Sequence, residues 1–137
     1  MAEIKNVGFL KTVLVIFAVV TILYGIGYFF VPSTLVKLAG ETPVFNGWLR
    51  WSGGILVALG IGAILVYLNP KNQGIFVTTV ALGCLLSGLG LVWSWIELPE
   101  GSNAWFTVLP TIIVLALAIL LWMARVNAKE ILYPKQD

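Results

Sequence analysis

Arginine and glutamate each stand beside tryptophans at the end of an apolar run, and this pattern is the one in the chain best suited to binding a polar group. Arg50 lies between Trp48 and Trp51 at the start of one run. Glu97 follows Trp95 at the end of another. If the two runs are neighbours, a half-buried guanidinium and carboxylate framed by indole rings would hold a lipid headgroup, a quinone head or a small anion. The commoner alternative is a structural ion pair at the membrane edge, with both side chains extending toward water.

Catalytic chemistry is not indicated by the remaining reactive residues. Glu97 and Glu100 are three positions apart on a predicted loop that contains Pro99, a poor arrangement for an acid and a base, and neither a nucleophile nor an oriented base accompanies them. The single cysteine, Cys84, lies inside an apolar run, which excludes an internal disulfide and a paired-thiol motif. Histidine is absent, so the commonest haem and transition-metal ligand is missing. We therefore expect no catalytic residue, no metal and no cofactor.

The composition predicts that lipid surrounds the elements that position these residues. The chain has 137 residues, 60% of them hydrophobic and 10% charged, against about half and about a quarter in soluble domains. Because about 20 apolar residues cross a bilayer core, four runs are long enough to span it, and each ends at proline or charge. The predicted spans are residues 12–31, 48–68, 75–96 and 104–124. We expect an all-α fold, a single four-span transmembrane domain over residues 1–137, with the first span kept as an uncleaved anchor.

Basic residues predict the orientation of this four-helix bundle, since short positively charged segments stay in the cytoplasm. Two of the eight basic residues, Lys37 and Arg50, fall on one side of the predicted membrane. The other six share the side of the chain ends: Lys5, Lys11, Lys71, Arg125, Lys129 and Lys135. We therefore expect a multi-pass protein of the cell membrane with both termini in the cytoplasm. The net charge of +2 is dispersed, which does not favour nucleic acid as a partner.

Small residues predict which helix faces pack, because lipid leaves close backbone approach as a main source of attraction between helices. Four-residue spacing marks such faces on the second and third spans, at Gly54, Ala58, Gly62, Gly83, Ser87 and Gly88. We expect these spans to pack tightly as a hairpin across residues 69–74, with the first span alongside. The fourth span has no comparable stripe and is expected to face lipid or a partner. The same small faces would also suit contacts within a homo-oligomer.

The segment 32–47 between the first two spans is too long for a tight turn and reads as an interfacial element. Ser33 is suited to cap a short helix and Gly40 to end it. A surface connector is the simpler interpretation, and a lid over the mouth of the bundle is the alternative.

A family resemblance appears around Arg50. Pro32, Leu35 and Gly40, followed by Leu49-Arg50-Trp51-Ser52-Gly53-Gly54 and Leu59-Gly60-Ile61-Gly62, resemble small bacterial four-helix membrane proteins of the DoxX-like kind and related uncharacterised families. The resemblance covers the first two spans best. It implies an architecture and leaves the reaction open.

Three functional hypotheses follow. The interiors of the spans carry no Asp, Glu, Lys or Arg, which argues against an ion-driven transporter. We expect a noncatalytic subunit or scaffold whose outer face, around Arg50, Trp51, Trp95 and Glu97, contacts membrane lipid or a membrane-protein partner. The alternatives are an oligomeric channel or carrier for a small neutral or anionic solute, and an enzyme acting on a membrane lipid or quinone.

Overall fold

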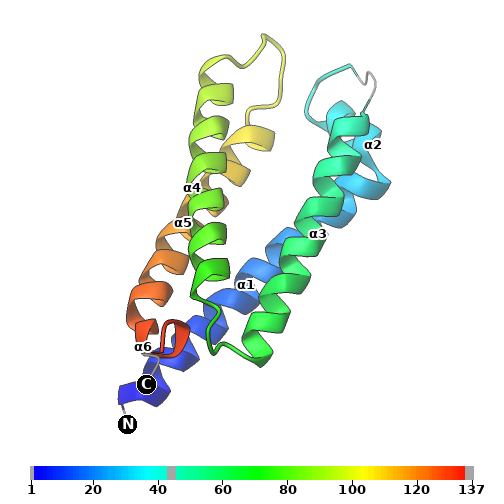
Figure 1. The fold of residues 1–137 in the computed structure, drawn as a ribbon. Coiled ribbons are helices and arrows are strands. Elements are labelled where there is room, and N and C mark those ends of the chain that lie inside the picture. The colour runs from blue at the N-terminus through cyan, green and yellow to red at the C-terminus, as the bar shows by residue number, and fades with distance from the viewer. Residues whose placement is uncertain (1, 43–45, 135–137) are drawn as a thin grey trace.

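All regular secondary structure in the described part of the chain is helical. The computed structural model describes residues 2–42 and 46–134, which form six helices and no strand (Figure 1). The helices are α1 (Ala2–Phe30), α2 (Pro32–Leu38), α3 (Gly47–Leu68), α4 (Gly74–Ile96), α5 (Trp105–Asn127) and α6 (Lys129–Leu132). Four of them, α1, α3, α4 and α5, are long and apolar enough to cross a membrane. The prediction of an all-helical chain with four such helices is confirmed.

The four long helices run alternately up and down between two ends of the molecule. The start of α1 and the short helix α6 lie at one end, called here the terminal end (Figure 1). The connection that follows α2, described over residues 39–42, and the connection 97–104 lie at the opposite end, called here the loop end. Proline stands at two of the predicted helix ends: Pro32 opens α2 one residue after α1, and Asn69 and Pro70 follow the last residue of α3. The fourth span was expected to end before Arg125, but α5 continues to Asn127.

The helices pack as two pairs rather than as a central hairpin. α1 packs along α3, α4 packs along α5, and α5 joins the pairs through a smaller contact with α1. The prediction that the second and third spans form the tight hairpin was therefore wrong. So was the expectation that the fourth span lies apart facing lipid or a partner, because α5 buries Leu117, Ala118, Leu121 and Ala124.

Close backbone approach between glycines explains the first pair. A Cβ added to Gly53 of α3 would lie 2.6 Å from the carbonyl oxygen of Gly25 and 2.7 Å from the amide nitrogen of Phe29 in α1. Two turns further along α3, a Cβ on Gly60 would lie 2.8 Å from Thr21 Oγ1. Gly53 and Gly60 share one side of the helix, so α1 lies against that side.

The small residues singled out from the sequence have different surroundings. Gly54 and Gly83 have no atom of another element within 4 Å of an added Cβ, and Ala58 and Ser87 are exposed. Two others do meet a neighbour, Gly62 the ring of Phe76 and Gly88 the side chain of Leu115. The outward-facing members remain available for contact with another chain, which stays a prediction.

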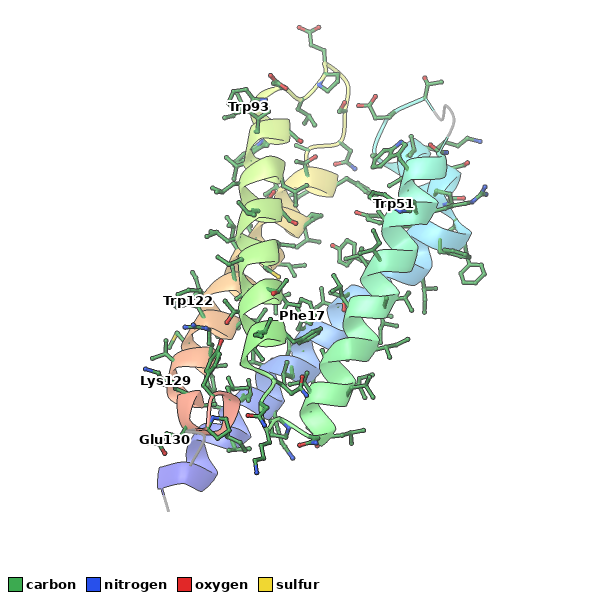
Figure 2. The ribbon with its side chains drawn as sticks, viewed as in Figure 1. Phe17, Trp51, Trp93, Trp122, Lys129 and Glu130 are labelled. Atoms are coloured by element: carbon green, nitrogen blue, oxygen red, sulfur yellow. The ribbon has the colours of Figure 1, made fainter. Side chains whose placement is uncertain are left out.

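The buried core occupies the half of the molecule at the terminal end. Its members come from all four long helices and include Leu10, Leu14, Phe17, Ala63, Val66, Val77, Ala81, Leu117 and Leu121. Phe17 lies where the two pairs meet (Figure 2). Beyond this point the pairs move apart toward the loop end (Figure 1). The two helix pairs are therefore packed together at the terminal end and separated toward the loop end.

A hydrogen-bonded cluster strengthens the terminal end. Arg125 donates from Nε to Thr78 Oγ1 at 2.6 Å, and the hydroxyls of Thr78 and Tyr133 are 2.7 Å apart. The Arg125 guanidinium also lies over the rings of Trp122 and Tyr133, at 4.9 and 5.5 Å from their centroids. These contacts bind the segment after α5 to the start of α4.

The predicted interfacial segment contains the short helix α2. Residues 43–45 of that segment lie outside the described residues. Gly40 follows α2 with φ +84°, a left-handed conformation that favours glycine, as the prediction of an ending there requires. Ser33, however, is the second residue of α2 and not its cap. Its hydroxyl instead accepts a hydrogen bond from Asn46 Nδ2 at 3.0 Å.

Candidate functional site

The four candidate residues from the sequence lie at the loop end but are not brought together. Arg50 and Trp51 are exposed within the first two turns of α3. Trp95 and Glu97 are exposed at the end of α4. These ends belong to different helix pairs, and within the described residues no ion pair or hydrogen bond joins Arg50 to Glu97. Figure 2 shows the separation through Trp51 and Trp93, which stand on opposite arms.

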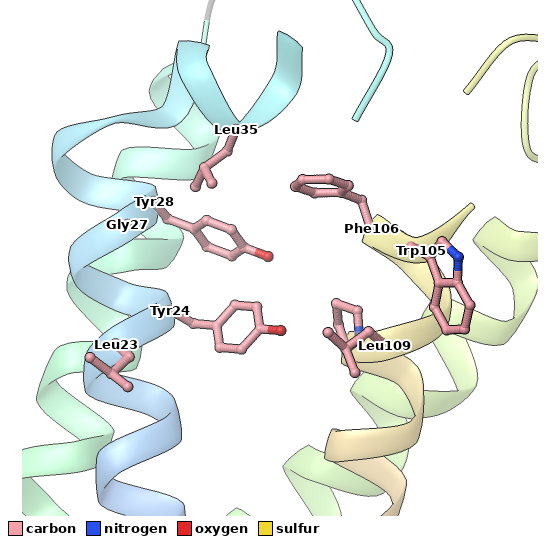
Figure 3. Close-up of a pocket in the computed structure, with 9 residues that line it drawn as sticks. Leu23, Tyr24, Gly27, Tyr28, Leu35, Trp105, Phe106 and Leu109 are labelled. Atoms are coloured by element: carbon pink, nitrogen blue, oxygen red, sulfur yellow. The ribbon is translucent and has the colours of Figure 1, made fainter. Parts of the chain in front are cut away.

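A cleft between the two helix pairs is the feature that the sequence did not reveal. It has a volume of about 400 Å³, within the range of about 300–1,000 Å³ typical of small-molecule sites. Its walls come from α1, α2 and α5 (Figure 3). The lining residues are Leu23, Tyr24, Gly27, Tyr28, Leu35, Trp105, Phe106, Leu109 and Pro110.

The cleft follows from how α1 is held. The glycine contact at Gly25 and Gly53 holds the loop-end half of α1 against α3, away from α5. On the cleft side, Gly27 has no side chain to fill the space, and a Cβ there would meet Leu35 of α2 at an ordinary 3.4 Å. The cleft remains between the pairs because α1 packs against α3 and because Gly27 presents no side chain toward α5.

The polar groups of this apolar surface are two tyrosine hydroxyls and the indole N–H of Trp105. Tyr24 and Tyr28 are one helical turn apart on α1, with ring centroids 6.0 Å apart in an edge-on arrangement. Figure 3 shows both hydroxyls pointing across the cleft toward the wall formed by Phe106 and Leu109. Neither hydroxyl has a hydrogen-bond partner among residues 2–42 and 46–134.

Three threonines within the spans differ from these tyrosines. Thr21, Thr78 and Thr111 each donate to a backbone carbonyl four residues earlier in their own helix, at 2.8, 2.7 and 2.6 Å. The sequence predicts this behaviour for hydroxyls within membrane helices, and it is confirmed for these three. Tyr24 and Tyr28 differ from these three threonines, because no carbonyl of the described residues accepts a hydrogen bond from their hydroxyls.

The loops at the loop end tie the two pairs together above the cleft. The Asn103 amide donates to the Ala39 carbonyl at 2.8 Å, and the Ser102 hydroxyl donates to the Glu41 carboxylate. A Cβ on Gly40 would lie 2.9 Å from the Gly101 carbonyl oxygen, so these two loops are in close contact. We call these contacts, between residues 39–41 and 101–103, the loop strap. The strap and α2 limit the cleft toward the loop end, and the buried core limits it toward the terminal end.

The chemistry of the cleft suits binding rather than reaction. None of its nine lining residues is an acid, a base or a sulfur nucleophile at neutral pH. Among the described residues, no three His, Cys, Asp or Glu side chains are grouped so that they could hold a metal ion. The surface offers dispersion contacts, aromatic faces, two hydroxyl donors and the indole N–H donor of Trp105.

A signal for this site was present in the sequence but was not used. Of the four tyrosines, Tyr67 and Tyr133 fit an interfacial belt, whereas Tyr24 and Tyr28 fall inside the first span at a spacing of four. Two tyrosines on one face of a membrane helix need hydrogen-bond partners there. That spacing alone would have directed attention to α1.

No protein-family model, curated protein or solved structure matches this chain. The resemblance of its first two spans to the DoxX-like proteins therefore stays a prediction.

Proposed function

We propose that this chain is a noncatalytic membrane protein, a helical-bundle subunit or scaffold, that binds membrane lipid in the cleft between its two helix pairs. The observation that carries the proposal is the cleft itself, which has about 400 Å³ of apolar space and no reactive side chain in its lining. Within a bilayer, an apolar space that opens between helices is filled most favourably by hydrocarbon. A lipid chain meets this need without any further group from the protein.

The position of the protein in the membrane is part of the proposal. Four basic residues of the terminal end, Lys11, Lys71, Arg125 and Lys129, favour its location on the cytoplasmic side of the cell membrane. The cleft would then lie in the outer leaflet. In this arrangement Arg50, Trp51, Trp95 and Glu97 form separate anchors on the rim at the outer interface, where charged side chains and indoles are stable.

The channel or carrier hypothesis would require several chains. Gly54 and Gly83 face away from all other described elements, so they suit close contact with another copy. A homo-oligomer that makes liposomes permeable to a solute would favour this alternative over the lipid-binding subunit. A stable complex with an unrelated membrane protein would instead support the role of a subunit.

Native mass spectrometry of the protein purified in mild detergent tests the lipid-binding proposal. We expect one lipid to remain bound to each wild-type chain. Gly27→Phe places a ring in the cleft and should abolish this retention. Gly83→Phe is the matched control, because Gly83 lies on an exposed face of α4 with open space around it, and it should retain lipid as the wild type does.

Circular dichroism and gel filtration of both variants establish that they remain folded. Equal lipid retention by a folded Gly27→Phe variant and by the control would contradict the proposal, since the cleft would then not be where lipid binds.

A further inference from the structure

We propose that the cleft recognises a glycerophospholipid through the ester carbonyl of one acyl chain, with the hydroxyls of Tyr24 and Tyr28 as the hydrogen-bond donors. This inference rests on the proposed function, that lipid occupies the cleft, and adds the chemical class of lipid and the groups that select it.

The first step is the unpaired donors. A phenol hydroxyl in a low-dielectric setting is destabilised when it has no acceptor. Figure 3 shows the Tyr24 and Tyr28 hydroxyls directed into the cleft rather than along α1. In contrast to Thr21, Thr78 and Thr111, they do not use a carbonyl of their own helix. An occupant that provides an acceptor between them would satisfy this pair.

The second step is their depth. The span Val7–Phe30 has 24 residues, about 36 Å of helix at 1.5 Å per residue, so each end extends about 3 Å beyond a hydrocarbon core of about 30 Å. Tyr28 lies two residues before the end of α1, about 3 Å below it, which places it at the hydrocarbon boundary. Tyr24 lies one turn deeper. The ester groups of phospholipids occupy this boundary, with the acyl chains below them.

The third step is the chemistry of the lining. No charged side chain lines the cleft, so a free carboxylate or phosphate would be bound there without a counterion. An ester carbonyl is neutral and accepts hydrogen bonds without donating any, which matches a pair of donors. Below the carbonyl, Leu23, Leu109 and Pro110 provide an apolar path for the acyl chain.

The fourth step is the loop end, where the headgroup would lie. Leu35 contributes to the cleft from α2, and Lys37 is exposed on the same short helix. A lysine there supplies positive charge at the level of a lipid phosphate. A glycerophospholipid fits both polar groups of this region: its phosphate would lie near Lys37 at the loop end, and its first ester carbonyl would lie near the Tyr28 hydroxyl.

A comparison of ester and ether lipids tests the inference. Purified protein is incubated with equal amounts of a diacyl phosphatidylcholine and the dialkyl ether phosphatidylcholine with the same chains, and native mass spectrometry gives the ratio retained. An ether oxygen is a weaker acceptor than an ester carbonyl. We expect the wild type to retain the ester lipid about twofold to tenfold over the ether, the preference that one net hydrogen bond provides.

The double variant Tyr24→Phe/Tyr28→Phe removes the two donors and keeps the rings, so it should retain lipid with an ester-to-ether ratio near one. Tyr67→Phe, at the terminal end, is the matched control and should keep the wild-type ratio. Equal retention of both lipids by the wild type, or an ester preference that survives in the double variant, would overturn the inference while leaving lipid binding in place. Failure of the wild type to retain either lipid would overturn the proposed function with it.

Discussion

Gly53 is the position at which the pairing of α1 with α3 can be tested most sharply. A methyl group there would lie 2.6 Å from the Gly25 carbonyl oxygen, whereas ordinary contact begins at 3.4 Å. The blocking atoms are backbone, so no side chain can turn aside. Gly53→Ala should therefore force the two helices apart by about 0.8 Å over this contact.

The neighbouring residue provides the control. Gly54 is in the same helix and has open space where its methyl group would lie, so Gly54→Ala adds a side chain without a clash. Both substitutions gain the same helix propensity, about 1 kcal/mol in a soluble helix, and this contribution cancels between them. Overpacking typically costs about 1–3 kcal/mol, which is the expected difference in unfolding free energy between the two variants.

Unfolding in mixed micelles of mild detergent and sodium dodecyl sulfate, followed by circular dichroism, measures this difference. We expect Gly53→Ala to unfold at a lower fraction of dodecyl sulfate than Gly54→Ala, and Gly54→Ala to equal or exceed the wild type. Equal midpoints for the two variants would refute the glycine contact and with it the reason why α1 lies away from α5.

Three further predictions concern the other contacts of the fold. Gly88→Ala should lower the free energy of unfolding by about 1 kcal/mol, because its methyl group would overlap the side chain of Leu115. Gly83→Ala has open space at its methyl group and should not lower it. Equal unfolding midpoints for these two variants in the same assay would contradict the prediction. Tyr133→Phe removes the hydrogen bond between the Tyr133 and Thr78 hydroxyls and should weaken the docking of α6 by about 0.5–1.5 kcal/mol. Amide hydrogen exchange of α6 measures this effect, and unchanged protection of its amides would contradict the prediction. Gly40→Ala places a side chain at φ +84° against the Gly101 carbonyl, so amide exchange within the loop strap should accelerate; protection equal to the wild type would count against the strap.

The helices were predictable from the sequence because each depends on local chemistry. Apolar length defines a membrane helix, and Pro32, Pro70 and Pro99 stand at or near its ends. The left-handed turn at Gly40 was predictable for the same reason.

The pairing of the helices was not predictable in this way. α3 has two adjacent rows of small residues, one with Gly53 and Gly60 and one with Gly54 and Gly62, and either suits a close partner. Choosing the second row predicted a hairpin of α3 and α4 and placed Arg50 near Glu97. The fold uses the first row against α1, so the predicted neighbours lie on separate arms. The cleft arises from that same choice, which is why its residues could not be assembled from sequence spacing alone.

Photo-crosslinking tests most directly the claim that lipid occupies the cleft. A phospholipid with a diazirine in one acyl chain is incorporated with the wild-type protein into a bilayer, activated, and mapped by peptide mass spectrometry. We predict that labelling concentrates on the cleft walls around Tyr24 and Leu109. Ile119, which is 62% exposed on α5 outside the cleft, should be labelled less than these walls. Labelling that follows exposure alone, strong at Ile119 and absent from the cleft walls, would contradict the account.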